Sequence, residues 1–232
     1  MLNPIDALRG LRAVGRIVND PTNLDEVFVL ADLSEQSSQL EKVIAELRGD
    51  PVLARIFDDK PRLGAIDQDA LAELPEGTLG REYAEFMRAR GLRHEDLKLV
   101  QSDDRDIDWI RNHLRETHDL WHVVTGFHTD VAGELGLQAL YAAQIAGPLP
   151  ILLLAVGMTN TLVKGMDDMP ARLDAIARGW LLGKRSKSMF GLRFADWLER
   201  PLAELRAELD MALDEVDDIV ATEGAQTLLA AA

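Results

Sequence analysis

Residues 115–136, RETHDLWHVVTGFHTDVAGELG, hold three of the five histidines of the chain and predict two helices joined by a turn. His118 and His122 are four residues apart. One helix therefore presents both imidazoles on the same face, about 6 Å apart along its axis, an arrangement that metal-binding helices use. Asp119 lies about 100° round the helix, where it would bind from the flank or orient another ligand.

Glu134 is the carboxylate that we expect to complete this cluster. On one straight helix it would lie about 18 Å beyond His122 and about 120° out of phase, so a single helix cannot bring the two together. Gly126 can end the first helix. Thr129 or Asp130 can cap a second helix, which would present Glu134 from its first turns. Two histidines and a carboxylate leave coordination positions open, as suits Zn²⁺, Fe²⁺ or Mn²⁺.

The same residues also have simpler interpretations. A histidine pair at this spacing is common in helical proteins, where it pairs with nearby carboxylates, and spacing alone leaves this alternative open. His128 falls in the expected turn and is interpreted as a loop residue, and Asp130 as a cap. Aspartate follows His118 where H-E-x-x-H metalloproteases have glutamate, which disfavours peptidase chemistry.

The rest of the chain predicts an all-α protein. Apolar residues recur at three- and four-residue steps, whereas the alternation typical of strands is almost absent. With 232 residues, we expect a single domain, 1–232, folded as a multi-helix bundle with the metal site between two adjacent helices. The clearest helices are expected at 106–125, 129–145, 170–182 and 195–222.

Charge and cysteine content exclude several classes of function. The chain has 40 Asp and Glu against 25 Lys and Arg, so its net charge of -15 makes nucleic acid an unexpected partner. There is no cysteine, so any metal must be held by nitrogen and oxygen. The N-terminus has no apolar signal core, and we expect the protein in the cytoplasm.

No charged residue occurs between Glu134 and Lys164. Gly147, Pro148 and Pro150 divide this stretch into pieces shorter than the roughly 20 residues that a transmembrane helix needs. Buried core is the simplest interpretation. A channel for a long apolar substrate and the seam of a homodimer are the alternatives.

Two local basic clusters contrast with the acidic whole. Basic and apolar side chains together favour anionic lipid headgroups, so we expect peripheral membrane association, with solvated charge beside core positions as the alternative. The clusters are Arg9, Arg12 and Arg16 with Leu8, Leu11 and Val14, and Lys184, Arg185, Lys187 and Arg193 around Met189 and Phe190.

Several motifs resemble one known family. HDLWH (118–122), followed by eleven residues and Glu134, matches the HDxxH-(x)11-E signature of the Coq4 family of ubiquinone-biosynthesis proteins. LPEGTLGREYAEFM (74–87) and RETHDLWHVVTGF (115–127) are similar to further blocks of that family. GWLLGKRSKSMFGLRFADWLERPLAELRAEL (179–209) follows the family's order of elements, so the similarity spans nearly the whole chain.

The resemblance implies an all-helical protein with a divalent metal, most readily zinc, with iron, manganese or magnesium as alternatives. The implied metal ligands and catalytic residues are His118, Asp119, His122 and Glu134. The implied substrate is a polyprenylated hydroxybenzoate-type ring, and the implied reaction is oxidative decarboxylation with hydroxylation at ring carbon C1. The protein would thus be a metal-dependent decarboxylase, a lyase or oxidative enzyme.

Three roles remain open at this point. The alternative to the enzyme is a non-catalytic, lipid-binding scaffold that organises the other coenzyme Q biosynthesis enzymes, and a generic metallohydrolase is the least favoured. The resemblance implies the polyprenylated quinone precursor and the other coenzyme Q biosynthesis proteins as partners. The expected location is the cytoplasm, peripherally on the inner face of the cell membrane.

Overall fold

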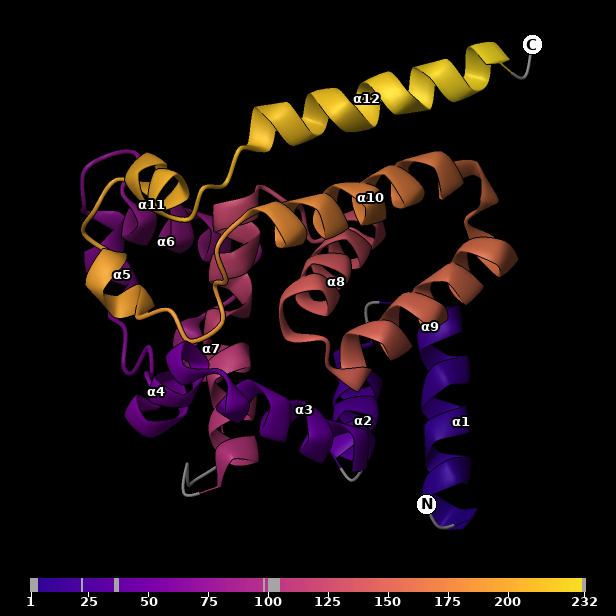
Figure 1. The fold of residues 1–232 in the computed structure, drawn as a ribbon, viewed down its shortest axis with the longest axis horizontal. Helices are drawn as coiled ribbons and strands as arrows, with labels where there is room; N and C mark the ends of the chain where they lie inside the picture. Colours follow the sequence, from indigo (N-terminus) through magenta and orange to yellow (C-terminus); the bar gives the residue numbers. More distant parts are fainter. Residues whose placement is uncertain (1–3, 22, 36–37, 98, 100–104, 231–232) are drawn as a thin grey trace. The chain divides into compact units, whose positions relative to one another are not determined.

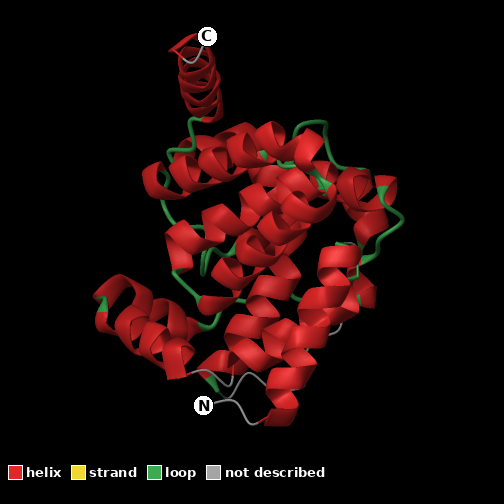
Figure 2. Cartoon of the chain, turned by 90° about the vertical axis from the view of Figure 1, so that its right-hand side faces the viewer, coloured by secondary structure: helices red, strands yellow, loops and turns green. Residues whose placement is uncertain are grey.

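The computed structural model describes the chain except residues 1–3, 22, 36–37, 98, 100–104 and 231–232. The described residues form helices and loops without a strand, which confirms the all-α prediction (Figures 1 and 2). The helices are α1 (Pro4–Asn19), α2 (Leu24–Glu35), α3 (Ser38–Gly49), α4 (Pro51–Asp59), α5 (Gln68–Ala72), α6 (Leu79–Ala89), α7 (Asp106–Thr125), α8 (Val131–Ile145), α9 (Pro148–Lys164), α10 (Met169–Arg185), α11 (Leu202–Glu208) and α12 (Leu213–Ala230). Short 3₁₀ helices lie at η1 (His94–Asp96), η2 (Met166–Asp168) and η3 (Phe194–Trp197).

The chain divides into two compact units. The first comprises Met1–Glu46, His128–Lys184 and Leu213–Ala232, and the second comprises Leu47–Phe127 and Arg185–Ala212. Each unit therefore combines segments that are distant in sequence. The expectation of a single domain over 1–232 stays a prediction.

In the first unit, α1, α2 and α9 pack around a shared apolar core. The amide of Asn160 on α9 donates to the carbonyl of Val18 on α1 at 2.8 Å, which adds a polar tie to the apolar contact. The core is formed by Ala13, Ile17, Leu30 and Val156.

The uncharged stretch forms α8 and α9. The break between them falls at Ala146 and Gly147, as the sequence predicted, and Pro148 begins α9 at the first helical position, where its missing N–H leaves no bond unmade. On α8, Leu137 and Leu140 are fully buried, which confirms the core interpretation for this half of the stretch.

No single described helix is long and apolar enough to cross a bilayer. Among the described helices, one pair of successive segments, Pro148–Lys164 and Met166–Arg185, has the required length and composition when taken together, but it is bent by 117° at the break. Part of this region is nevertheless exposed and apolar. Ile151, Leu162 and Val163 on α9 all expose more than half of their surface.

In the second unit, α7 runs through an aromatic core. The ring of Trp109 on α7 lies 5.3 Å from that of Phe57 and 5.5 Å from that of Phe190, measured between centroids. Its indole N–H donates to the carbonyl of Pro61 at 3.1 Å. Farther along α7, the buried carboxylate of Glu116 accepts from Nε and Nη2 of Arg62, at 2.8 and 2.6 Å. The aromatic core and this ion pair fix α7 against the loop that follows α4.

The helices expected at 106–125, 129–145 and 170–182 are present with small differences at their ends, but a continuous helix over 195–222 is wrong. Pro201 has an extended backbone with ψ 132° and bridges to Thr78 instead of continuing a helix. Asp210 has a positive φ of 54°, which ends α11 and separates it from α12.

The two basic clusters differ in the structure. Met189 and Phe190 are buried, so the second cluster does not have the exposed apolar side chains that the sequence suggested. Its Arg193 pairs with Asp59, at 3.1 Å. On α1, by contrast, Leu11 is 75% exposed, and a basic and apolar surface is present there.

Candidate metal centre

α7 carries the two histidines of the motif one helical turn apart. Their imidazole rings lie at 88° to each other with centroids 4.9 Å apart. Gly126 ends the helix in the left-handed conformation, φ 74°, and its N–H donates to the His122 carbonyl at 2.8 Å. A residue with a Cβ atom is strained at such a φ, so the glycine allows the chain to turn directly after the second histidine. The turn predicted at this position is confirmed.

The start of α8 determines where Glu134 lies. Asp130 caps the helix, because its carboxylate accepts from the Gly133 N–H at 2.8 Å, and the cap interpretation is confirmed. A Cβ atom at Gly133 would lie 1.9 Å from the carbonyl oxygen of His128, so only glycine lets the first turn pack this closely on the loop. Glu134 follows at once, in the first turn of α8, as predicted. His128 itself is an exposed loop residue.

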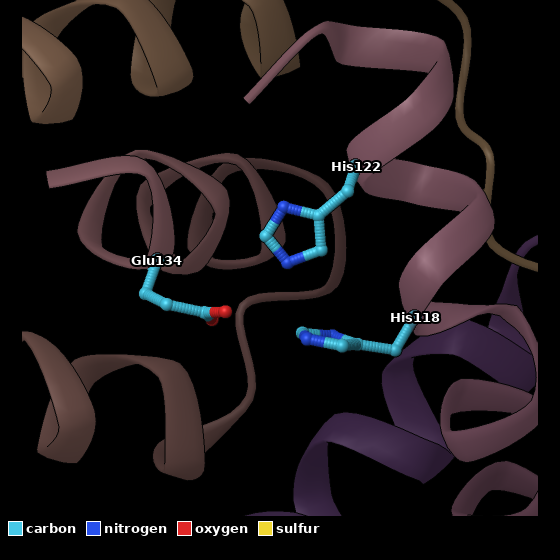
Figure 3. A group of neighbouring side chains, drawn as sticks. All are labelled: His118, His122 and Glu134. Carbon is cyan, nitrogen blue, oxygen red and sulfur yellow. The ribbon is translucent and has the colours of Figure 1, made fainter. Parts of the chain in front are cut away.

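One ligand atom from each of His118, His122 and Glu134 lies within 4.8 Å of the others. Figure 3 shows the two imidazoles of α7 and the carboxylate of α8 pointing toward one another. His122 is buried and the other two are half-buried. Donors that share a zinc ion lie roughly 3–4 Å apart, given bonds of roughly 2.0–2.2 Å, so small side-chain rotations suffice for these three to bind one cation.

His122 is further defined by its own hydrogen bond. Its Nδ1 atom lies 3.1 Å from the carbonyl oxygen of Phe127, and a carbonyl can only accept, so Nδ1 carries the proton in this bond. The lone pair of the neutral ring is then on Nε2. A histidine that donates to a backbone carbonyl and offers its other nitrogen to the cation is the usual arrangement at metal sites. These donors therefore fit a divalent metal.

Asp119, the fourth expected ligand, does not belong to this three-residue group and stays a prediction as a ligand. It is half-buried on α7, and its charge acts on a neighbouring phenol. Burial, followed by the charges of Asp119 and Glu116, raises the pKa of Tyr83, so this phenol stays protonated. Its hydroxyl lies 3.0 Å from Nδ1 of His94.

The tautomer of His94 shows that Tyr83 is the donor in that bond. Nε2 of His94 lies 3.0 Å from the Gly64 carbonyl, which can only accept, so Nδ1 is left to accept from the phenol. Tyr83 and His94 thus form a satisfied buried pair that joins α6 to η1 and, through His94, to the loop at Gly64. Sequence reasoning missed this pair, because nothing in a single sequence joins the two residues.

A second residue missed from the sequence is Arg206 on α11. Its Nε donates to the Val124 carbonyl at 2.8 Å and its Nη2 to the Val123 carbonyl at 3.1 Å. Carbonyls in the last turn of a helix have no partner within the helix. A cation there also interacts favourably with the negative end of the helix dipole. Arg206 therefore holds the end of α7 immediately after His122.

The chain is similar to proteins of one family. A family model described as "Coenzyme Q (ubiquinone) biosynthesis protein Coq4" matches residues 7–214. The chain is 30% identical over 213 residues to the mitochondrial ubiquinone biosynthesis protein COQ4 homolog of Danio rerio, covering 88% of this chain and 76% of that protein. It is 28% identical over 193 residues to the corresponding Xenopus laevis protein, covering 82% and 67%.

One solved structure agrees with these matches. It is a crystal structure of a protein from Nostoc punctiforme assigned to ubiquinone biosynthesis, with a TM-score of 0.77 and 30% sequence identity. The match covers 88% of this chain and 97% of the other.

Proposed function

Because the chain belongs to the Coq4 family of coenzyme Q (ubiquinone) biosynthesis proteins, we propose that His118, His122 and Glu134 bind a divalent cation that holds a ring intermediate of this pathway. The convergence of these three donors is the observation that supports the proposal most strongly. Three residues of the family signature supply its nitrogen and oxygen donors. Zinc fits this donor set, and iron, manganese and magnesium are the alternatives that metal analysis distinguishes.

The proposed substrate is a polyprenylated hydroxybenzoate. Its carboxylate and phenolic oxygens are anionic or polar, and a bound cation with open positions would neutralise their charge and fix the ring. Its isoprenoid tail gains roughly 25 cal/mol per Å² of apolar surface removed from water. The α8 half of the uncharged stretch is core, so the exposed apolar side chains of α9, Ile151, Leu162 and Val163, are the part of it suited to that tail.

The proposed reaction replaces the carboxylate at ring carbon C1 by a hydroxyl group. The bond from C1 to the carboxylate breaks and CO₂ leaves, while one oxygen atom of dioxygen forms the new C–O bond. The other oxygen atom leaves as water, with two electrons and two protons from a reducing co-substrate. The protein's own residues bind and orient the ring in this scheme. Asp119 and Glu134 are the carboxylates that would hold or move a proton there, beside the two histidines.

A scaffold without catalysis is the second candidate. It is favoured by exposed apolar side chains on α1 and α9, which are suited to lipid or to other proteins of the pathway. The largest of them are Ile5, Leu8, Leu11, Ile151, Leu162 and Val163.

Metal binding tests the first step of the proposal. We expect the purified wild-type protein to bind about one equivalent of zinc or cobalt, and a His118→Ala, Glu134→Ala double variant to lose that binding. His128→Ala is the matched control, since His128 is exposed in the nearby loop and lies outside the group. Isothermal titration of the metal-free proteins measures the difference. Equal binding by the double variant and the wild type would refute the site.

A further inference from the structure

The imidazole of His122 is flanked by an aromatic ring from the neighbouring helix. Phe86 on α6 stacks on it, with the ring centroids 5.6 Å apart and the planes inclined by only 24°. Near-parallel rings at this separation are an offset stack, which is a favoured geometry for aromatic pairs.

Phe86 is itself held in place. The guanidinium carbon of Arg90 lies 3.6 Å from the centre of the Phe86 ring, and Arg90 also donates to the Phe86 carbonyl at 3.0 Å. The start of α6 is anchored as well. Gly80 donates to the Leu198 carbonyl at 2.8 Å, and a Cβ atom at Gly80 would lie only 2.8 Å from that oxygen. The ring that meets His122 therefore comes from a helix with little freedom to shift.

The stack and the hydrogen bond restrict different motions of the His122 ring. Stacking on Phe86 fixes the plane of the imidazole, but it would tolerate a half-turn about the Cβ–Cγ bond, which exchanges nitrogen and carbon positions. The bond from Nδ1 to the Phe127 carbonyl excludes the half-turn, but alone it lets the ring tilt. Only together do the two contacts direct Nε2 along one line.

We propose that Phe86 is a positioning residue, which presets the His122 ring so that Nε2 is directed toward an incoming cation. The cation part of this inference rests on the proposed metal site, whereas the presetting of the ring does not. Removal of a group that orients a metal ligand typically weakens metal binding roughly 10- to 100-fold.

The first test is the affinity of the whole metal-free chain for cobalt or zinc. We expect Phe86→Leu to bind the ion at least roughly 10-fold more weakly than the wild type, and Phe86→Tyr, which keeps the ring, to bind within roughly threefold of it. Trp197→Leu is the matched control, because Trp197 is also half-buried under an arginine, with Arg200 at 3.7 Å from its ring. The melting temperature of each variant is measured alongside.

The second test needs no metal. Nitrogen NMR of the imidazoles at neutral pH, with His122 assigned through His122→Gln, should show a single Nδ1–H tautomer for His122 in the wild type and in Trp197→Leu. Phe86→Leu should show a broadened or mixed signal. If the wild type binds no cation, the proposed metal site is refuted. The comparison of the His122 signal between the wild type and Phe86→Leu still decides whether Phe86 presets the ring.

Two results would overturn the role of Phe86. One is an unchanged His122 signal in Phe86→Leu. The other is an equal loss of affinity in Phe86→Leu and Trp197→Leu, which would show that any lost aromatic contact has the same effect.

Discussion

His113 lies five residues before the first metal-site histidine, but its hydrogen bonds are structural. Its Nδ1 donates to the Pro61 carbonyl at 3.1 Å, and its Nε2 accepts from the Gly191 N–H at 3.0 Å. Burial lowers the pKa of His113 from 6.5 to about 4. The neutral ring thus joins three segments of the second unit, and a proton on Nε2 would break one of its bonds.

The lowered pKa of His113 predicts a loss of stability in mild acid. The unfolded chain takes up a proton on this histidine below about pH 6.5, whereas the folded chain resists until about pH 4. The contribution is therefore complete above pH 6.5 and is lost as the pH falls toward 4. We expect it to lower the free energy of unfolding by about 2 kcal/mol between pH 7 and pH 5. Urea unfolding at both pH values measures this.

His113→Gln is the control for the pH effect. It cannot titrate, so this part of the pH dependence should disappear, although the variant should be less stable at pH 7. An identical pH dependence in the variant and the wild type would show that another group is responsible.

At the scale of single residues, the metal-binding side chains could be predicted from the sequence, but the residues that orient them could not. The spacing of His118 and His122 and the glycine and aspartate of the turn follow local rules for helices and caps. The stack of Phe86 on His122 joins residues 36 positions apart, and no local rule describes such a contact.

At the scale of elements, the end of α7 depends on α11. Arg206→Met keeps the apolar stem of the side chain and removes both hydrogen bonds to the Val123 and Val124 carbonyls. We expect this to lower the free energy of unfolding by about 1–2 kcal/mol, and to speed amide exchange in the last turn of α7. Chemical denaturation and hydrogen exchange measure the two effects.

Arg200→Met provides the comparison for Arg206. Arg200 forms an exposed ion pair with Glu204, and such pairs contribute about 0–1 kcal/mol. If both variants lower the free energy of unfolding equally, the contact of Arg206 with α7 contributes no more than an exposed ion pair.

The elements themselves were predicted unevenly, for physical reasons. α7 begins and ends where its periodicity and Gly126 indicate. The stretch 195–222 has the same helical periodicity, but the backbone of Pro201 bridges to Thr78 and the N–H of Leu202 donates to the Gly77 carbonyl. These distant partners replace the helical bonds, and periodicity cannot detect them.

At the scale of the whole molecule, we propose that the exposed apolar and basic face of α1 places the protein on anionic membranes. Leu11 is exposed beside the exposed Arg12 on this helix. Burial of a leucine contributes about 1.5–3 kcal/mol, so Leu11→Glu should reduce binding to phosphatidylglycerol vesicles at low salt roughly tenfold or more. Co-sedimentation measures the bound fraction.

Leu92→Glu is the control for membrane binding, because Leu92 is an exposed leucine of the second unit. It should bind vesicles like the wild type. If Leu11→Glu sediments as fully as Leu92→Glu, α1 is not the membrane-binding face.

We propose that the three-residue group, with its cation, acts on a ring intermediate of ubiquinone biosynthesis. The direct test is CO₂ release from a prenylated hydroxybenzoate by the purified, metal-loaded protein under air with an added two-electron reductant, without other proteins of the pathway. We expect turnover by the wild type and by His128→Ala, and at least a roughly 100-fold loss in the His118→Ala, Glu134→Ala double variant. Equal turnover by the double variant would contradict the claim, and no turnover by a folded, metal-loaded wild type would favour the scaffold instead.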